Sequence, residues 1–523
     1  MEEPTVLSLV KVLAPSLTLL AAAGLVATMS ARSSLGPTWS RAVAALSLLL
    51  ALLLATLQVD QAAGFAGIPL GPVSVSLIQL RFTPLTLAWM QLLFLGAAAL
   101  VLVSPPSALP LTLALVGASA PALMVGSFPA LCLAWFLVEV TLAAVGPSPA
   151  TGNAWFPLLF GTAAVLAAFH TSASDEALIL SLGSLRPVSW LLLVTGVALR
   201  TRWWSPASLA SGELLPAAPF LAAVATGFFT LNHLESVPRG GEVSEGLWLI
   251  FLLVSLTAAL LAWGHRRSGP TAILRSAAGL LLPLILLGTL SLPPSPWVGP
   301  AAAQVLAALV GLTVLQRLLR PPWLPAWTIT AAGVVVGVTL LPWPVLPYGR
   351  AIAATLEALS STRPAAAVVL ALAAGLPAAA LLAATRSEDH GETRSPAEVS
   401  TSLAALILPL LVAYLAWSLS AAASRSDAAL LYSGPSLGAL AMAVLGGFVG
   451  LVLAVADRAS LLLSLDNVLP TGLDVAVVRA GSWLSSRVSA AAETVFRFLE
   501  GETPLTWAVL IGAAVLVLAA GQL

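Results

Sequence analysis

One acidic residue lies where a membrane span is expected. Glu139 is in the run Phe128–Val145 (FPALCLAWFLVEVTLAAV), which is otherwise uncharged. About eighteen apolar residues suffice to cross a bilayer, and an ionisable group inside such a span costs roughly 2.5 to 3.5 kcal/mol on insertion scales. A carboxylate kept there indicates proton or ion handling. The alternative is a glutamate that a neighbouring helix satisfies, or one that faces a small wet cavity without transport.

Two other ionisable residues extend this hypothesis. Arg200 precedes a stretch with Pro206, Gly212 and two further prolines, which predicts an interrupted helix rather than a straight one. The alternative is an ordinary loop with interfacial Trp anchors. His233 is at the end of an apolar run, and a histidine titrates near neutral pH. It is either a proton carrier or an interfacial side chain facing water. The predicted proton or ion path is Glu139, Arg200 and His233.

Other chemistry is disfavoured. The four histidines and the single cysteine, Cys132, show no metal-ligand spacing, and no nucleophile or nucleotide-binding motif stands in a usable context. We therefore expect no metal, no catalytic residue and no cofactor bound by this chain. Because the formal net charge is zero and no basic patch is seen, we expect no nucleic-acid partner.

The composition is that of an integral membrane protein. Of 523 residues, 59% are hydrophobic and only 8% are charged, whereas soluble domains average about 25% charged residues. Lys11 is the only lysine among 22 basic residues. Arginine stays protonated where a buried lysine can release its proton, so a proton relay beyond position 11 must work without lysine.

The elements that must position these residues are transmembrane helices. Apolar runs predict an all-α polytopic bundle of roughly 14 to 16 spans with a broken helix. The candidate spans centre near residues 17, 49, 93, 116, 137, 162, 193, 224, 254, 281, 308, 332, 374, 410, 444 and 513. We assign 1–456 to the bundle, 457–503 to a lateral amphipathic helix on the cytoplasmic side, and 504–523 to a final transmembrane anchor. Arg386–Glu398 is expected to be an extramembrane loop.

The arginines predict an orientation. Most of them fall in loops after odd-numbered spans, for example Arg32, Arg41, Arg317 and Arg458. Fewer follow even-numbered spans, for example Arg81, Arg186, Arg239 and Arg350. The positive-inside rule then places the odd loops in the cytoplasm and the N-terminus outside. We expect a multi-pass protein of the inner (plasma) membrane.

Several segments resemble one known family. Phe82–Leu87 resembles the start of its third helix, and Leu131–Val140, with Trp before Glu, resembles its "F-x-x-W-E" motif. Gly196–Arg200 resembles its "G-x-x-x-K", and Pro216–Pro219 resembles its "A-P-x-x-x-S". The family is that of the antiporter-like membrane subunits of respiratory complex I, Mrp-type antiporters and membrane-bound hydrogenases.

The resemblance implies a function. Glu139 would be the membrane glutamate of the ion path, with Arg200 where the family has its central lysine. The chain would be a subunit of an NADH-quinone oxidoreductase-like complex, either proton- or cation-translocating or degenerate, and would work with other membrane subunits while redox chemistry occurs elsewhere. It would be a non-redox translocase subunit, and whether it counts as an enzyme stays open.

Three alternatives remain: a stand-alone transporter or permease, a non-conducting structural subunit, and a membrane glycosyltransferase. The last usually needs a larger external loop than this chain offers. The family hypothesis requires helix breaks near Pro206 and near the middle of a later span, with Glu139 facing the bundle interior.

Overall fold

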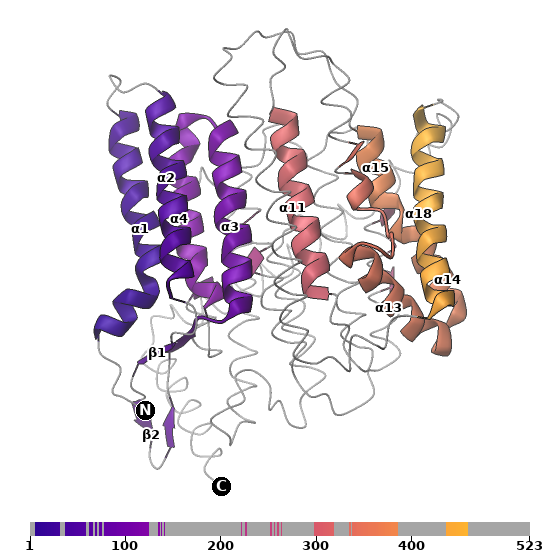
Figure 1. Cartoon of the computed structure of the whole chain (residues 1–523), viewed down its shortest axis with the longest axis horizontal. Helices are drawn as coiled ribbons and strands as arrows, with labels where there is room; N and C mark the ends of the chain where they lie inside the picture. The colour runs from indigo at the N-terminus through magenta and orange to yellow at the C-terminus, as the bar shows by residue number, and fades with distance from the viewer. Residues whose placement is uncertain are drawn as a thin grey trace, which may run out of the picture.

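Helices stand side by side in a broad bundle, with α1–α4 at one side, α11 between, and α13, α14, α15 and α18 at the other (Figure 1). This computed structural model describes residues 6–31, 37–58, 62–65, 68–70, 73–75, 78–124, 298–317, 337–384 and 436–458, with scattered positions at 134–141, 221–263 and 334–335. The architecture is the all-α polytopic membrane bundle that the sequence predicts.

The helices and strands have the following bounds. The first group comprises α1 (Val6–Ala31), α2 (Pro37–Thr56), α3 (Pro84–Val103) and α4 (Leu109–Ser119), with short 3-10 turns η1 (Pro106–Ala108) and η2 (Ala120–Leu123) flanking α4. The second comprises α11 (Val298–Arg317), α13 (Pro347–Thr362), α14 (Pro364–Ala374), α15 (Leu376–Ala384) and α18 (Leu437–Arg458).

Five segments among the described residues are long and apolar enough to cross a membrane: Val10–Ser30, Trp39–Thr56, Thr86–Val103, Pro106–Leu123 and Leu437–Ala456. They coincide with the spans predicted near residues 17, 49, 93, 116 and 444, which confirms these five as helices. In the span Thr86–Val103 of α3, 78% of the residues are buried, against 33% in the span Leu437–Ala456 of α18. Helix α3 is therefore an interior helix, whereas α18 turns much of its apolar surface outward.

Local sequence explains where α3 begins and ends. The Thr83 hydroxyl accepts a hydrogen bond from the Thr86 amide at 3.1 Å, and Pro84 occupies the first turn. Such a cap satisfies an amide that has no partner inside the helix, and proline fits there because no amide is needed. The helix stops at Ser104, where Pro105 and Pro106 follow. Proline before or after a helix thus sets its length.

Close contact between α1 and α4 is made by small residues. Ser16 of α1 donates a buried hydrogen bond to the carbonyl oxygen of Gly117 on α4. A Cβ added at Gly117 would lie 3.1 Å from Leu19 Cβ and 3.2 Å from the Ser16 carbonyl oxygen. Helices in lipid gain most from such close packing, since lipid is as apolar as their side chains.

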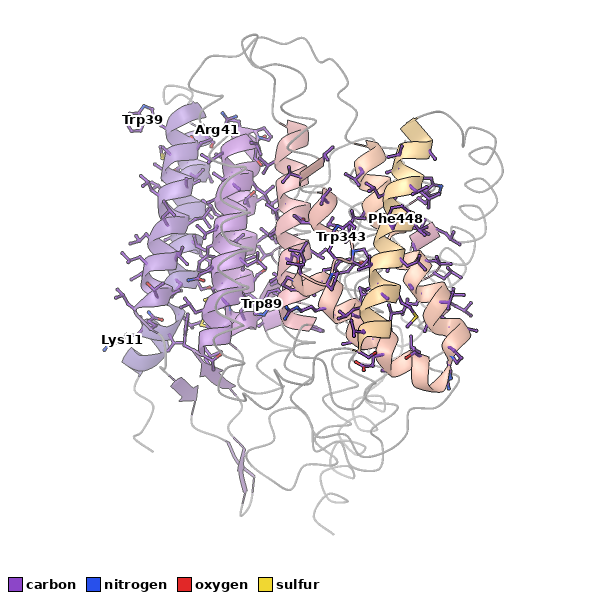
Figure 2. All side chains as sticks on the ribbon, turned by 45° about the vertical axis from the view of Figure 1, so that its right-hand side comes forward. Lys11, Trp39, Arg41, Trp89, Trp343 and Phe448 are labelled. Carbon is purple, nitrogen blue, oxygen red and sulfur yellow. The ribbon has the colours of Figure 1, made fainter. Side chains whose placement is uncertain are left out.

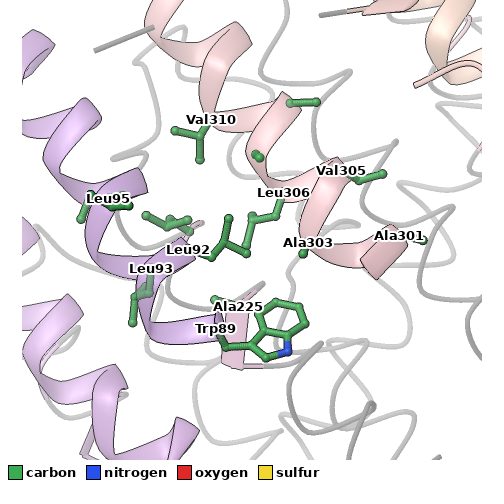
Figure 3. Packing of buried hydrophobic residues seen from close by; sticks show 14 of the residues in the cluster. Trp89, Leu92, Leu93, Leu95, Ala225, Ala301, Ala303, Val305, Leu306 and Val310 are labelled. Carbon is green, nitrogen blue, oxygen red and sulfur yellow. The ribbon is translucent and has the colours of Figure 1, made fainter. Parts of the chain in front are cut away.

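The chain directions in the bundle can be traced from two contacts. Arg41, near the start of α2, donates from Nε to the Ser104 carbonyl oxygen at the end of α3, at 3.2 Å. A Cβ added at Gly96 of α3 would lie 3.7 Å from Val310 of α11, and Trp89 lies toward Ala303 nearer the start of both helices (Figure 3). Helices α3 and α11 therefore run parallel, and both end at the Arg41 end of the bundle.

This arrangement agrees with the span numbering behind the predicted orientation. Figure 2 places Trp39 and Arg41 at one end and Lys11 at the other. Helices α3 and α11 correspond to the third and eleventh predicted spans, both odd, and α11 ends at Arg317. Trp39, 65% exposed, is the kind of residue that anchors a helix at a membrane surface. Which end faces the cytoplasm remains a prediction.

The sequence did not predict the two pairs of short strands between α2 and α3. Strand β1 (Ala62–Phe65) pairs antiparallel with β4 (Ile78–Arg81), and β2 (Ile68–Leu70) pairs with β3 (Val73–Val75). The sequence Gly71-Pro72 lies between β2 and β3, as is usual for a turn. These strands are too short to change the fold class.

Candidate functional site

Gln304 is a polar side chain buried among the apolar residues of α11. It is 7% exposed. Its Nε2 donates to the Thr339 carbonyl oxygen at 2.6 Å, and its Oε1 accepts from the Tyr348 amide at 3.0 Å. Thr339 is the last helical residue before an interruption, and Tyr348 lies in the first turn of α13. A single amide side chain thus satisfies backbone groups on both sides of the break.

The interruption spans residues 340–346 and is shaped by proline. The sequence Pro342-Trp343-Pro344 removes two amide donors and prevents helix continuation. Tight turns replace the helix: the Trp343 amide donates to the Leu341 carbonyl oxygen at 2.7 Å, and the Leu346 amide donates to that of Trp343 at 3.0 Å. Figure 2 shows Trp343 near mid-height of the bundle. Irregular backbone at this depth is tolerated only where it is buried or lines a cavity.

Gly349 allows the interruption to fold back on α13. A Cβ at this position would overlap the Trp343 carbonyl group. Any other residue would push the loop away from the first turn of the helix. Gly349 therefore fixes how closely the interruption approaches Tyr348.

A second interruption falls at Gly375, between α14 and α15. Pro377 has no amide to donate to the Ala373 carbonyl oxygen, so the regular pattern of hydrogen bonds stops there. The buried Tyr348 hydroxyl donates to the Ala374 carbonyl oxygen at 3.3 Å. This break lies in the middle of the span predicted near residue 374, so the interruption expected in a later span is confirmed.

Helix α18 holds the second interruption through its glycines. A Cβ at Gly446 would overlap the Ala371 carbonyl group, and one at Gly375 would overlap that of Gly446. One at Gly450 would lie 2.6 Å from the Gly375 carbonyl oxygen. Gly446 and Gly450 form the four-residue spacing that lets two membrane helices approach to backbone contact.

Among the described residues, the buried side chains of the site include an amide, a phenol and apolar groups, and the amide and phenol bind backbone carbonyls at two helix breaks. One charged group reaches the first interruption: Arg350 donates from Nε to the Pro344 carbonyl oxygen at 3.0 Å. Within the described residues no three His, Cys, Asp or Glu side chains gather as metal ligands. The buried amide, phenol and backbone carbonyls of this arrangement can donate and accept hydrogen bonds, or solvate a passing proton or cation.

The three residues predicted for the ion path, Glu139, Arg200 and His233, lie outside the described residues. Trp135 and Val138, just before Glu139, are buried. The predicted break near Pro206, the lateral helix at 457–503 and the anchor at 504–523 also lie outside the described part of the chain.

Sequence reasoning missed Gln304 and Tyr348. Both are neutral, and a search for ionisable groups and ligand motifs passes over them. The usable signals were Gln304 inside the apolar run from Val298 to Val314, and prolines and glycines at 342, 344, 347, 349, 375 and 377. Helix α13 was missed too, because only one span was predicted between residues 340 and 395.

Comparison with known proteins identifies the fold. No protein-family model matches the sequence, and no curated protein matches it. Among solved structures, a chain of the Mrp complex from Dietzia sp. DQ12-45-1b is similar over 97% of this chain, with TM-score 0.64 and 17% identity. This chain has the fold of the antiporter-like membrane subunits.

Two structures of respiratory complex I from Thermus thermophilus agree. The one with bound NADH has TM-score 0.54 and 19% identity, covering 83% of this chain and 100% of that chain. The one with bound aureothin has TM-score 0.54 and 16% identity, covering 78% and 97%. The antiporter-like fold thus extends through most of the chain, although it spans only 62% of the length of the Mrp chain.

Proposed function

We propose that this antiporter-like membrane protein is a proton- or cation-translocating subunit of a larger membrane complex. The observation that carries the proposal is the pair of helix interruptions whose backbone groups bind the buried side chains of Gln304 and Tyr348. Broken helices with polar contacts are costly in a membrane and usually line ion pathways. It would work with partner membrane subunits while redox chemistry occurs elsewhere in the complex, and this chain would bind no cofactor itself.

The proposed path combines this site with the sequence-predicted residues. Glu139 would be the titrating group, with Arg200 as its positive partner and His233 as a proton carrier. The neutral groups around Tyr348 would support transfer farther along the bundle. The odd-numbered loops would face the cytoplasm of an inner-membrane protein.

A second candidate function is a structural subunit that no longer conducts. The observation that favours it is Arg200, because an arginine cannot alternate between charged and neutral states as lysine does. A fixed ion pair between Arg200 and Glu139 would hold the helices without moving protons.

Reconstituted flux distinguishes the two functions. Vesicles containing the chain with its membrane partners are given a sodium or potassium gradient, and internal pH is followed with a trapped dye. We expect Glu139→Gln to abolish the pH change while assembly stays intact. Glu398→Gln, in the predicted extramembrane loop, is the matched control and should conduct normally. Wild-type vesicles that show no flux, or Glu139→Gln vesicles with unchanged flux, would favour the structural function.

A further inference from the structure

Helix α13 makes a hydrogen bond near each of its ends. In its first turn, Tyr348 donates to the Ala374 carbonyl oxygen at the Gly375 interruption. About two and a half turns later, Glu357 Oε1 accepts from the Ser436 amide at 3.1 Å, immediately before α18. A carboxylate at the N-terminus of a helix pairs with its unsatisfied amides and its positive dipole end. The buried interruption and the exposed start of α18 are thus attached to one rigid element.

Helix α18 connects Glu357 with the Gly375 interruption. It begins beside Glu357, where the Ser436 hydroxyl accepts from the Ala439 amide at 3.4 Å. Farther along, Gly446 and Gly450 contact the backbone of Ala371 and Gly375. The α14–α15 interruption is therefore held from two sides, by Tyr348 and by α18, and these two holders are themselves joined through Glu357.

We propose that α13 is a coupling helix, in which Tyr348 is the positioning residue that fixes the Gly375 interruption and Glu357 transmits its state to the exposed start of α18. This inference goes beyond the proposed function, because it concerns movement within the chain and holds whether or not ions pass. A change at Ser436 that loosens α18 loosens the interruption, and the reverse follows because coupling between two sites is reciprocal.

Hydrogen exchange on the full chain in lipid nanodiscs tests the coupling. Two amides serve as probes: that of Ala379, which donates to the Gly375 carbonyl oxygen at 3.0 Å, and that of Leu440, which donates to Ser436 at 3.0 Å. The variants are Tyr348→Phe, Glu357→Gln and the double substitution. Each single variant should raise exchange by about two- to twelvefold at its own end, the effect of one net hydrogen bond, and should also raise it at the far end.

The double variant and two controls make the test decisive. If the contacts are coupled, the double variant raises exchange by less than the product of the single effects. Thr18→Val, which removes a 2.8 Å hydrogen bond to Ala14 within α1, should change neither probe. Effects confined to the mutated end would overturn the proposal, as would an equal rise at the Leu87 amide in α3, which would mean general loosening. Since no ion flux is measured, failure here is separate from failure of the proposed function.

Discussion

The α1–α4 region and the α11–α18 region differ in where their polar side chains form hydrogen bonds. Helices α1, α2 and α3 are long and uninterrupted, and Thr83 and Arg41 make their hydrogen bonds at helix ends, while Ser16 joins α1 to α4. The second region has two helix interruptions, and the buried polar side chains Gln304 and Tyr348 bind backbone groups at them. Polar contacts thus end or join whole helices in the first region, and they hold interruptions in the second.

This difference predicts how strongly a substitution should destabilise each region. A continuous helix keeps its backbone groups satisfied in lipid without outside help. An interruption leaves carbonyls and amides that depend on a few specific partners, so their loss is felt strongly. The interrupted region should therefore be the more sensitive to conservative substitution.

The largest expected effect is at the α18 contact. Gly446→Ala places a methyl group into the Ala371 carbonyl, and backbone on both sides leaves little room to move. We expect a loss of about 3 kcal/mol in the free energy of unfolding, measured by thermal denaturation of the purified chain.

Two glycine controls sharpen this prediction. Gly447→Ala, one residue on, would contact Pro342 Cδ at an ordinary 3.6 Å and should change stability by less than about 0.5 kcal/mol. Gly117→Ala in the continuous region has contacts of 3.1 to 3.3 Å, and should cost about 1 kcal/mol. Equal losses at Gly446 and Gly447 would show that the close backbone contact is absent.

A smaller effect is expected from a matched pair of glutamines. Gln304→Leu removes the donor to the Thr339 carbonyl oxygen and the acceptor of the Tyr348 amide, which should cost about 2 kcal/mol. Gln91 on α3 has a buried Oε1 that no donor from the described part of the chain reaches, so Gln91→Leu should be neutral or slightly stabilising. Thermal denaturation of both variants compares the regions directly, and a reversed order would contradict the contrast between them.

The smallest effect is expected at a helix end. Thr83→Ala removes the cap of α3 and should cost about 1 kcal/mol. Because α3 is held along its whole length by buried contacts, the loss should stay local. It is checked by exchange at the Thr86 amide, which should rise while the middle of α3 remains protected. Exchange that rises throughout α3 would mean that the cap supports the whole helix.

How far the sequence could predict this structure differs between the regions. In α1–α4 the apolar runs and the prolines at 84, 105 and 106 mark the helices correctly, because hydropathy and helix ends are local properties. The hairpin between α2 and α3 escaped prediction, since its strands are three or four residues long. In the later region, hydropathy predicted one span near residue 374 where the structure has an interruption.

The residues of the candidate site were harder to predict from the sequence than the helices. A glutamate in an apolar run is visible from composition, and it directed attention to Glu139. Gln304 and Tyr348 matter because distant segments bring Thr339 and Ala374 to them, and no local pattern contains that information. The family resemblance predicted the fold correctly, whereas the roles of Glu139, Arg200 and His233 stay predictions.

We propose that the interrupted region serves translocation, whereas the continuous region should lose a polar contact without losing flux. The most direct measurement is proton or cation flux in vesicles for Tyr348→Phe, which removes the hydroxyl bonded to the Ala374 carbonyl oxygen, beside Thr83→Ala, which removes the hydroxyl that caps α3. We predict a several-fold lower flux for Tyr348→Phe and unchanged flux for Thr83→Ala, with both proteins assembled normally. Equal flux in the two variants would contradict the claim.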